Sequence, residues 1–150
     1  MVRATIVLCL LALVTRPAVA QESRQEIVIG QKYTLHSEVL GEDRPYWIYL
    51  PRSYNDSRLG KTRYPVLYLL DGNAYFHAGT GVVEQLVEVS RIPDLIVVGI
   101  PNTVRTRDMT PTHMTAGPYS AQSGGAPRFL QFLKEELFPK IEAQYRTSRS

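Results

Sequence analysis

Two arginines and an aspartate follow an apolar segment that ends at Pro101-Asn102; they are Arg105, Arg107 and Asp108. If that segment is a parallel strand, these side chains lie at its carboxyl end, where open α/β sheets place their ligands. A guanidinium there can hold a carboxylate, a catecholate or a polarised carbonyl through two parallel hydrogen bonds. The same residues can instead form a structural Arg–Asp pair that holds a long loop. The sequence leaves both interpretations open.

The sequence also lacks a recognisable nucleophile. Covalent ester hydrolysis needs an activated nucleophile, a base and donors for the oxyanion. None of the ten glycines begins Gly-x-Ser-x-Gly, the strained turn that exposes a catalytic serine. Ser120 with His113, or Ser123 with His77, could form a dyad, but both serines fall in an expected loop rather than on a rigid element. We therefore expect no serine-hydrolase activity from this sequence as it stands.

Cofactors and metals are equally unsupported by the residue pattern. The three histidines, His36, His77 and His113, are 41 and 36 residues apart, and the only cysteine is Cys9. This spacing does not favour a zinc site, and one cysteine cannot form an internal disulfide. Gly79-x-Gly81 does not continue into a dinucleotide-binding fingerprint. We expect neither a metal nor a cofactor.

The first twenty residues have the pattern of a secretory signal peptide. Arg3 supplies a positive charge, residues 6–14 are apolar, and residues 18–20 (Ala-Val-Ala) match a cleavage site. The apolar run is shorter than the roughly 20 residues that a membrane span requires. An uncleaved anchor is the alternative. We expect an exported protein, periplasmic or extracellular, that starts near Gln21 and has no later membrane span.

Composition excludes several classes of protein. The chain has 150 residues, of which 44% are hydrophobic and 21% charged, which is typical of a globular domain. The formal charge is +3, but when Arg3 and Arg16 of the expected signal peptide are set aside, 15 basic and 14 acidic side chains remain. A nearly neutral mature chain without a basic stripe does not favour binding to nucleic acid.

Hydrophobic patterning predicts the elements that position the arginines. Residues 33–37 and 46–50 alternate or are β-branched and aromatic, which predicts an antiparallel pair of strands. Residues 65–70 and 95–100 are continuous apolar runs, which are typical of strands buried on both faces of a parallel sheet. The amphipathic segment 81–89 between them completes a βαβ unit.

A last helix is expected over residues 127–144, with a kink at Pro139. The elements together predict an α/β fold in which two antiparallel strands lead into a parallel section. The strand count looks unfinished, because a second long helix should lead to another parallel strand. The organisation therefore suggests the N-terminal half of a domain.

Three segments resemble the esterase group of α/β-hydrolases, which includes ferric-siderophore esterases, S-formylglutathione hydrolases, feruloyl esterases and mycolyltransferases. Residues 68–73 (YLLDGN) resemble the end of the third strand of that group. Residues 97–111 (VVGIPNTVRTRDMTP) are similar to the segment after the fourth strand in its siderophore-esterase branch. Residues 124–142 resemble the helix that precedes the nucleophile strand.

The resemblance implies a three-layer α/β-hydrolase sheet that is incomplete, with strands 1–4 and two helices, over residues 21–150. It implies that the backbone N–H of Asn73 is one of the two oxyanion donors, the other being the residue after the nucleophile. Arg105, Arg107, Asp108 and Tyr75 are implied to bind substrate. Tyr75, with Phe76 and Tyr119, could form an apolar wall of the site or belong to the core.

The resulting expectation is the N-terminal portion of an exported serine esterase that lacks its nucleophile, with small-molecule carboxylic esters, siderophore esters among them, as substrates of the complete protein. A non-catalytic binding or interaction module of the same origin is the alternative, and a non-functional fragment is a third reading. In the family's strand order the fifth strand covers the third. Without it, residues 66–70 form a bare apolar edge, and we expect self-association through this edge.

Overall fold

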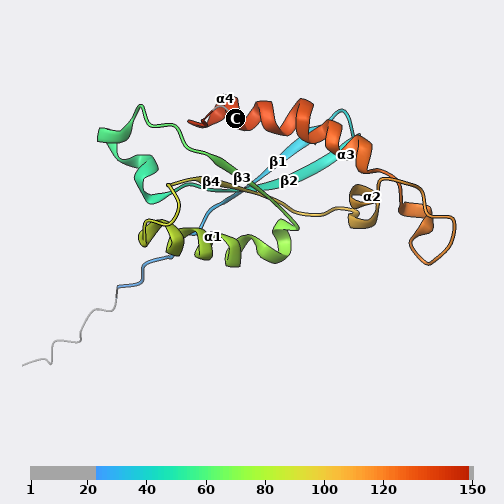
Figure 1. Cartoon of the computed structure of the whole chain (residues 1–150), viewed down its shortest axis with the longest axis horizontal. Helices are drawn as coiled ribbons and strands as arrows, with labels where there is room; N and C mark the ends of the chain where they lie inside the picture. Colours follow the sequence, from blue (N-terminus) through green and yellow to red (C-terminus); the bar gives the residue numbers. More distant parts are fainter. Residues whose placement is uncertain (1–22, 149–150) are drawn as a thin grey trace, which may run out of the picture.

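The computed structural model describes residues 23–148, so the expected signal peptide lies outside the described residues. Four strands form one sheet between two helical layers (Figure 1). The strands are β1 (Gln31–Ser37), β2 (Glu42–Tyr49), β3 (Val66–Leu70) and β4 (Ile96–Ile100). The helices are α1 (Gly72–Glu88), α2 (Arg105–Met109), α3 (Ala126–Phe132) and α4 (Phe138–Gln144), with a π-helical turn η4 (Leu133–Leu137) and 3-10 turns η1 (Arg52–Asn55), η2 (Ser57–Leu59) and η3 (Ser120–Gln122).

The sheet has the order β1-β2-β4-β3, with antiparallel β1–β2 and β2–β4 pairs and a parallel β3–β4 pair. This confirms the predicted antiparallel strands leading into a parallel section. All five residues of β4 are buried, as its continuous apolar run predicts. β2 begins at Glu42, earlier than expected, and includes Pro45 opposite Thr34. β4 pairs only with residues 47–49 of β2, so Pro45 lies outside that ladder, where a missing N–H is tolerated.

Helix α1 covers one face of the sheet and begins at Gly72, nine residues before the expected start at 81. This start could not be predicted from the sequence, because glycine is a weak helix former and both Gly79 and Gly81 lie within the segment. The packing of α1 against the sheet outweighs the low helix propensity of these glycines. A Cβ at Gly79 would lie 2.9 Å from the Leu69 side chain, so glycine allows the helix to approach β3 closely. Phe76 and Val83 point into the core below the sheet.

The other face is covered by one nearly continuous helical rod, α3–η4–α4 (Figure 1). The expected kink at Pro139 is replaced by the π-helical turn η4. Proline has no N–H to donate, and the N–H of Phe138 bonds to the carbonyl of Leu133, five residues back. The wider turn accommodates the proline without ending the helix. The rod is anchored by residues that are at most 7% exposed: Phe129, Phe132, Leu133, Leu137 and Ile141.

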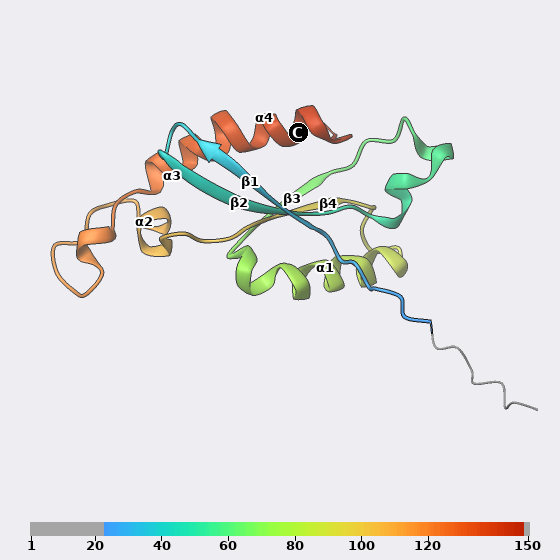
Figure 2. The same cartoon turned by 180° about the vertical axis from the view of Figure 1, so that it is seen from behind.

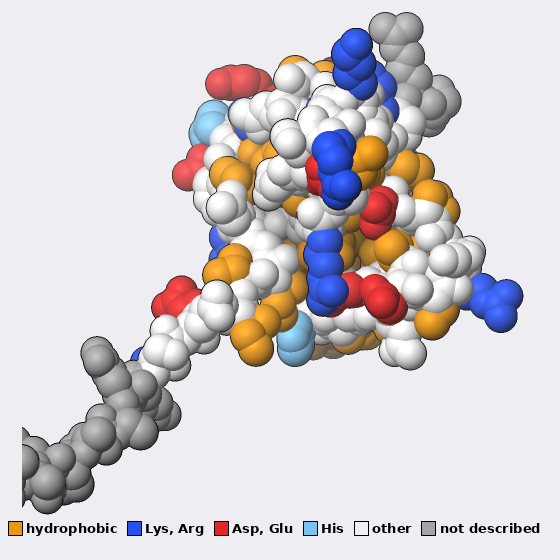
Figure 3. All heavy atoms as spheres, turned by 90° about the vertical axis from the view of Figure 1, so that its left-hand side faces the viewer, with side chains coloured by type: hydrophobic (Ala, Val, Ile, Leu, Met, Phe, Trp, Pro, Cys, Tyr) orange, Lys and Arg blue, Asp and Glu red, His pale blue; other side chains and the backbone are white. Residues whose placement is uncertain are grey.

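The remaining surface carries both charged and hydrophobic side chains. Residues 23–30 lead away from β1 past α1 toward the N-terminus (Figure 2). In the end-on view, basic and acidic side chains lie among hydrophobic ones (Figure 3). None of the helices within residues 23–148 combines the length and the apolar character that crossing a membrane requires.

Candidate active site

The turn between β3 and α1 lies at the carboxyl end of the parallel strands. Asp71 has φ 54°, the left-handed conformation, which reverses the chain within one residue. Gly72 follows because there is no room for a side chain: a Cβ would lie 2.7 Å from the Ile100 nitrogen and 2.9 Å from the Gly99 carbonyl carbon. The strain of the reversal therefore falls on Asp71, whose φ is positive, and not on Gly72. The turn places Asn73 in the first turn of α1, with its side chain exposed.

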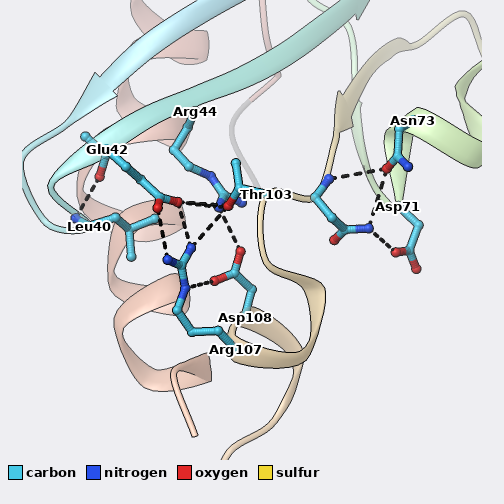
Figure 4. Close-up of polar contacts among 10 residues, drawn as sticks. Leu40, Glu42, Arg44, Asp71, Asn73, Thr103, Arg107 and Asp108 are labelled. Carbon is cyan, nitrogen blue, oxygen red and sulfur yellow. Dashed lines mark hydrogen bonds and ion pairs between the residues drawn. The ribbon is translucent and has the colours of Figure 1, made fainter. Parts of the chain in front are cut away.

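Polar side chains fasten this turn to the loop that follows β4 (Figure 4). The Asp71 carboxylate accepts two hydrogen bonds from Arg105, 2.8 Å from Nε and 3.1 Å from Nη2, and one of 2.5 Å from Asn102 Nδ2. The backbone N–H of Asn102 donates to Asn73 Oδ1 at 3.3 Å. The hydrogen bonds from Arg105 and then Asn102 lower the pKa of Asp71, so its carboxylate stays ionised. This group, Asp71, Asn73, Asn102 and Arg105, is called the turn cluster below.

A second group holds the start of β2 against α2. Arg107 donates to both carboxylate oxygens of Glu42, at 2.9 and 2.7 Å, and its Nε donates to Asp108 at 2.7 Å. Arg44 Nη1 donates to Glu42 at 2.9 Å and to Asp108 at 2.7 Å, while Thr103 donates to Glu42 at 2.9 Å. The guanidinium groups of Arg44 and Arg107 thus each bond to the carboxylates of both Glu42 and Asp108. We call Glu42, Arg44, Thr103, Arg107 and Asp108 the ion cluster (Figure 4).

The ion cluster is buried at Arg44 and Asp108, whereas Glu42 and Arg107 are partly exposed. The side chains of Arg44 and Asp108 are 1% and 0% exposed. The Arg44 guanidinium lies 5.2 Å and 5.5 Å from the ring centres of Phe129 and Phe132 on α3. Within residues 23–148 its Nε and Nη2 have no hydrogen-bond partner, and the two aromatic rings supply attraction in their place. Removing one charge from such a group would leave its counter-charge buried.

The structure separates the candidate residues that the sequence grouped together. Arg107 and Asp108 form the Arg–Asp pair that was one of the two interpretations, and their partners lie in the ion cluster. Arg105 belongs to the turn cluster, where its side chain is 63% exposed. Tyr75 is also exposed, one helical turn after Asp71, whereas Phe76 is buried edge-on against Trp47. Tyr75 and Phe76 therefore do not form one wall. Contact of these residues with a substrate remains a prediction.

Within residues 23–148, neither of the two serine–histidine pairs considered from the sequence, Ser120 with His113 and Ser123 with His77, forms a hydrogen bond. Ser123 lies 3.4 Å from His113 Nδ1, but its hydroxyl donates to the Ser120 carbonyl at 2.6 Å and accepts from the Met114 N–H at 2.7 Å. Ser120 donates to the Gly117 carbonyl. A hydroxyl whose proton is held by a carbonyl is not activated by the imidazole. In the part of the chain that the structure describes, no three His, Cys, Asp or Glu side chains gather as metal ligands would.

Sequence reasoning missed Glu42, Arg44 and Asp71 as members of these clusters. A signal for Arg44 exists in β2, where Arg44, Tyr46 and Ile48 alternate toward the buried face. A charge at an inward position of a strand requires a buried counter-charge. The pattern cannot say where this partner lies, because Asp108 is 64 residues away in the chain.

The ion cluster makes the stability of the fold depend on pH. Hydrogen bonds from Arg107, and then from Arg44 and Thr103, lower the pKa of Glu42 from 4.5 to about 2, although partial burial opposes the shift. A lowered folded-state pKa stabilises the fold above the unfolded value, and this stabilisation is lost as pH falls through the folded value. We expect the difference in unfolding free energy between the wild type and Glu42→Gln to be constant above about pH 5 and to shrink toward pH 2, as measured by urea titration. Glu88→Gln, an exposed change on α1, should show no such trend.

Comparison with known proteins gives the class to which this geometry belongs. The model of the family described as "Putative esterase" matches residues 37–150. The apo-salmochelin esterase of Escherichia coli is 34% identical over 92 residues, which cover 53% of this chain and 29% of that protein. The ferri-bacillibactin esterase BesA of Bacillus subtilis is 30% identical over 125 residues, covering 72% and 43%. The crystal structure of an IroE-like serine hydrolase from Shewanella oneidensis superposes with a TM-score of 0.73 and 42% identity, over 79% of this chain and 39% of that one.

The fold and the strand-end turn therefore define an α/β-hydrolase sheet, confirmed by its structural neighbours. This chain belongs to the esterase family, whose members include siderophore esterases. The resemblance inferred from residues 68–73, 97–111 and 124–142 is confirmed at the level of the family. The matches span from 29% to 45% of the length of the curated relatives.

Proposed function

We propose that residues 21–150 form the N-terminal part of a serine esterase, contribute half of its oxyanion hole, and act in the complete protein on carboxylic esters of the siderophore class. The turn cluster carries this proposal. It fixes the start of a 17-residue helix at the carboxyl end of β3, where backbone N–H groups lack intrahelical partners. The positive end of the helix dipole favours negative charge at that point. The names of the relatives support the ester class.

In this proposal different residues of the chain bind the oxyanion, position the turn and contact the substrate. The N–H of Asn73 donates to the oxyanion that develops on the ester carbonyl oxygen. Asp71 positions that N–H, because Arg105 and Asn102 hold its carboxylate and with it the left-handed turn. Arg105 and Tyr75, both exposed beside the turn, are the candidate contacts with substrate. Arg107, which is partly exposed, and the buried Asp108 support the same loop through the ion cluster.

A chimera tests the proposal. Residues 23–146 of this chain would be joined to the part of the Shewanella hydrolase that follows the matched region. We expect a fluorophosphonate probe to modify one serine of the chimera and the chimera to hydrolyse a catecholate siderophore ester. The 150-residue chain alone should not be modified. Arg105→Ala should reduce hydrolysis, whereas Arg58→Ala, which removes an exposed pair with Asp56, should not.

The possible outcomes test the esterase role, the siderophore substrate class and the alternative of a binding module separately. A folded chimera that the probe does not modify would contradict an esterase role. Modification together with hydrolysis of simple esters only would contradict the siderophore class and leave the esterase role standing. If the unextended chain binds a siderophore in a manner that Arg105→Ala abolishes, while the chimera stays inactive, the alternative of a binding module holds instead.

Export belongs to the same proposal and has its own test. The charged, apolar and small-residue segments of residues 1–20 favour cleavage before Gln21. We expect N-terminal sequencing of the protein recovered from the periplasm or the medium to begin at Gln21. Recovery of an intact Met1 chain in the membrane fraction would favour the uncleaved anchor.

A further inference from the structure

A pocket lies beside β1, at the end of the sheet opposite to β3. Its volume of about 360 Å³ is at the lower end of the range of about 300–1,000 Å³ in which small-molecule sites fall. It is lined by residues 27–32, by Trp47 on β2, and by Phe76 and His77 on α1. The strand expected beyond β3 would be added at the other end of the sheet, so it would not cover this pocket.

The outer wall of the pocket belongs to residues 23–30, which pass along α1 (Figure 2) and are called the N-terminal arm below. The arm approaches the sheet closely at Gly30, where a Cβ would meet the backbone of β2 and lie 3.1 Å from the ring of Phe76. Ile29 is half-buried against the core cluster that contains Phe76. Ile27 and Val28 are 93% and 72% exposed. The arm is therefore anchored at residues 29 and 30 and leaves an apolar wall open to solvent.

The floor of the pocket is a row of side chains across the sheet. Lys32 lies opposite Trp47 in the β1–β2 pair, and Trp47 lies opposite Gly99 in the β2–β4 pair. The ring of Phe76 packs over Gly99 and meets Trp47 edge-on, with the ring centres 5.5 Å apart. Lys32 Nζ lies 4.5 Å from the centre of the Trp47 ring. Two aromatic rings and one ammonium group thus line the same pocket.

The charge of the pocket comes from Lys32. In the described part of the chain it is the only lysine, arginine, aspartate or glutamate among the lining residues. Within residues 23–148 no carboxylate forms an ion pair with its ammonium group. The contact with Trp47 is attractive but leaves the positive charge without a counter-ion. The pocket therefore favours a ligand with a negative charge.

We propose that this pocket binds a small aromatic carboxylate, with its ring between Trp47, Phe76 and the N-terminal arm and its carboxylate paired with Lys32. The two aromatic side chains and the apolar arm favour a ring, which can meet them through its edge or its face. The ammonium group favours a carboxylate at the edge of that ring, because a charge-assisted hydrogen bond is stronger than a neutral one. The site shares no residue with the turn cluster or the ion cluster, so it does not depend on the proposed esterase role.

Titration of the 150-residue chain with benzoate tests the proposal. Trp47 is the only tryptophan in the sequence, so its indole N–H gives a single signal in a nitrogen–proton correlation spectrum. We expect benzoate to move this signal saturably and acetate to leave it in place. Benzamide, which has the same ring without the charge, should bind more weakly. Lys32→Met should raise the dissociation constant of benzoate at least about threefold and remove its advantage over benzamide.

Two further variants locate the site. Lys134→Met removes an exposed lysine from the helical rod on the opposite face of the sheet and should leave benzoate binding unchanged. Ile27→Ser, at a side chain that is 93% exposed, should weaken benzoate and benzamide alike, because it removes part of the apolar wall.

Four results would overturn the proposal. The first is an indole signal that benzoate does not move saturably, and the second is one that acetate moves equally. The third is an equal loss of benzoate binding in Lys32→Met and Lys134→Met. The fourth is a signal that moves when the protein concentration alone is raised and no longer does so in Ile27→Ser, which would place a second copy of the chain in the pocket instead.

Discussion

Replacement of Arg44 by methionine is expected to lower the free energy of unfolding by about 3–5 kcal/mol, the largest effect we expect from a single side chain. Methionine retains much of the length that packs against Phe129 and Phe132. The loss arises because the Asp108 carboxylate, which is 0% exposed, would keep only Arg107 as its counter-charge. Denaturant titration followed by circular dichroism measures the change.

Two further variants make this prediction specific. Arg58→Met removes an arginine whose side chain is 86% exposed and pairs with Asp56, and it should leave the stability nearly unchanged. The double variant Arg44→Met/Asp108→Leu removes both buried charges of the pair, and we expect it to be more stable than Arg44→Met alone. If Arg44→Met and Arg58→Met have equal effects, the ion cluster does not stabilise the fold as described.

Gly72→Ala should give the second large effect, a loss of about 1–3 kcal/mol of stability together with displacement of the strand-end turn. The added methyl group would lie 2.7 Å from the Ile100 nitrogen, and a backbone atom inside the sheet cannot move aside as a side chain could. The start of α1 must therefore shift away from β4. We expect denaturant titration to show the loss, and the amide signal of Asn73 to move in a nitrogen–proton correlation spectrum.

Gly81→Ala is the control for this change, because it lies in the same helix and a Cβ there has no atom within 4 Å. It should stabilise the protein by about 0.5–1 kcal/mol, since alanine is the better helix former. A Gly72→Ala variant with unchanged stability and an unmoved Asn73 amide would show that the turn does not need its glycine.

Strand character could be predicted from the sequence because it is a local property. Continuous apolar runs and alternating segments identified all four strands, and the change from antiparallel to parallel pairing followed from the segments between them. The start of α1 could not be predicted in this way. Its glycine at 79 weakens the helix pattern locally, and its benefit comes from contact with Leu69 on another element.

The candidate site was predicted only in outline for a related reason. The sequence placed Arg105, Arg107 and Asp108 at a strand end, where all three were found. The sequence could not assign these arginines to different clusters, because their partners lie far away in the chain. Arg107 on α2 bonds to Glu42, 65 residues away, whereas Arg105 bonds to Asp71, 34 residues away. Side-chain direction on one helical turn decides which cluster each arginine joins.

The π-helical turn beneath Pro139 also corrects the phase of the C-terminal helix. Phe129, Leu133, Leu137 and Ile141 recur every four residues and are all buried. In an ideal α-helix a four-residue step overshoots a full rotation by about 40°, so three steps would carry Ile141 about 120° around the axis from Phe129. The one additional residue in η4 takes back about 100° of this drift, which keeps the four side chains on the stripe that faces the sheet. The turn that tolerates a proline is thus also what allows a four-residue repeat to remain a single apolar seam.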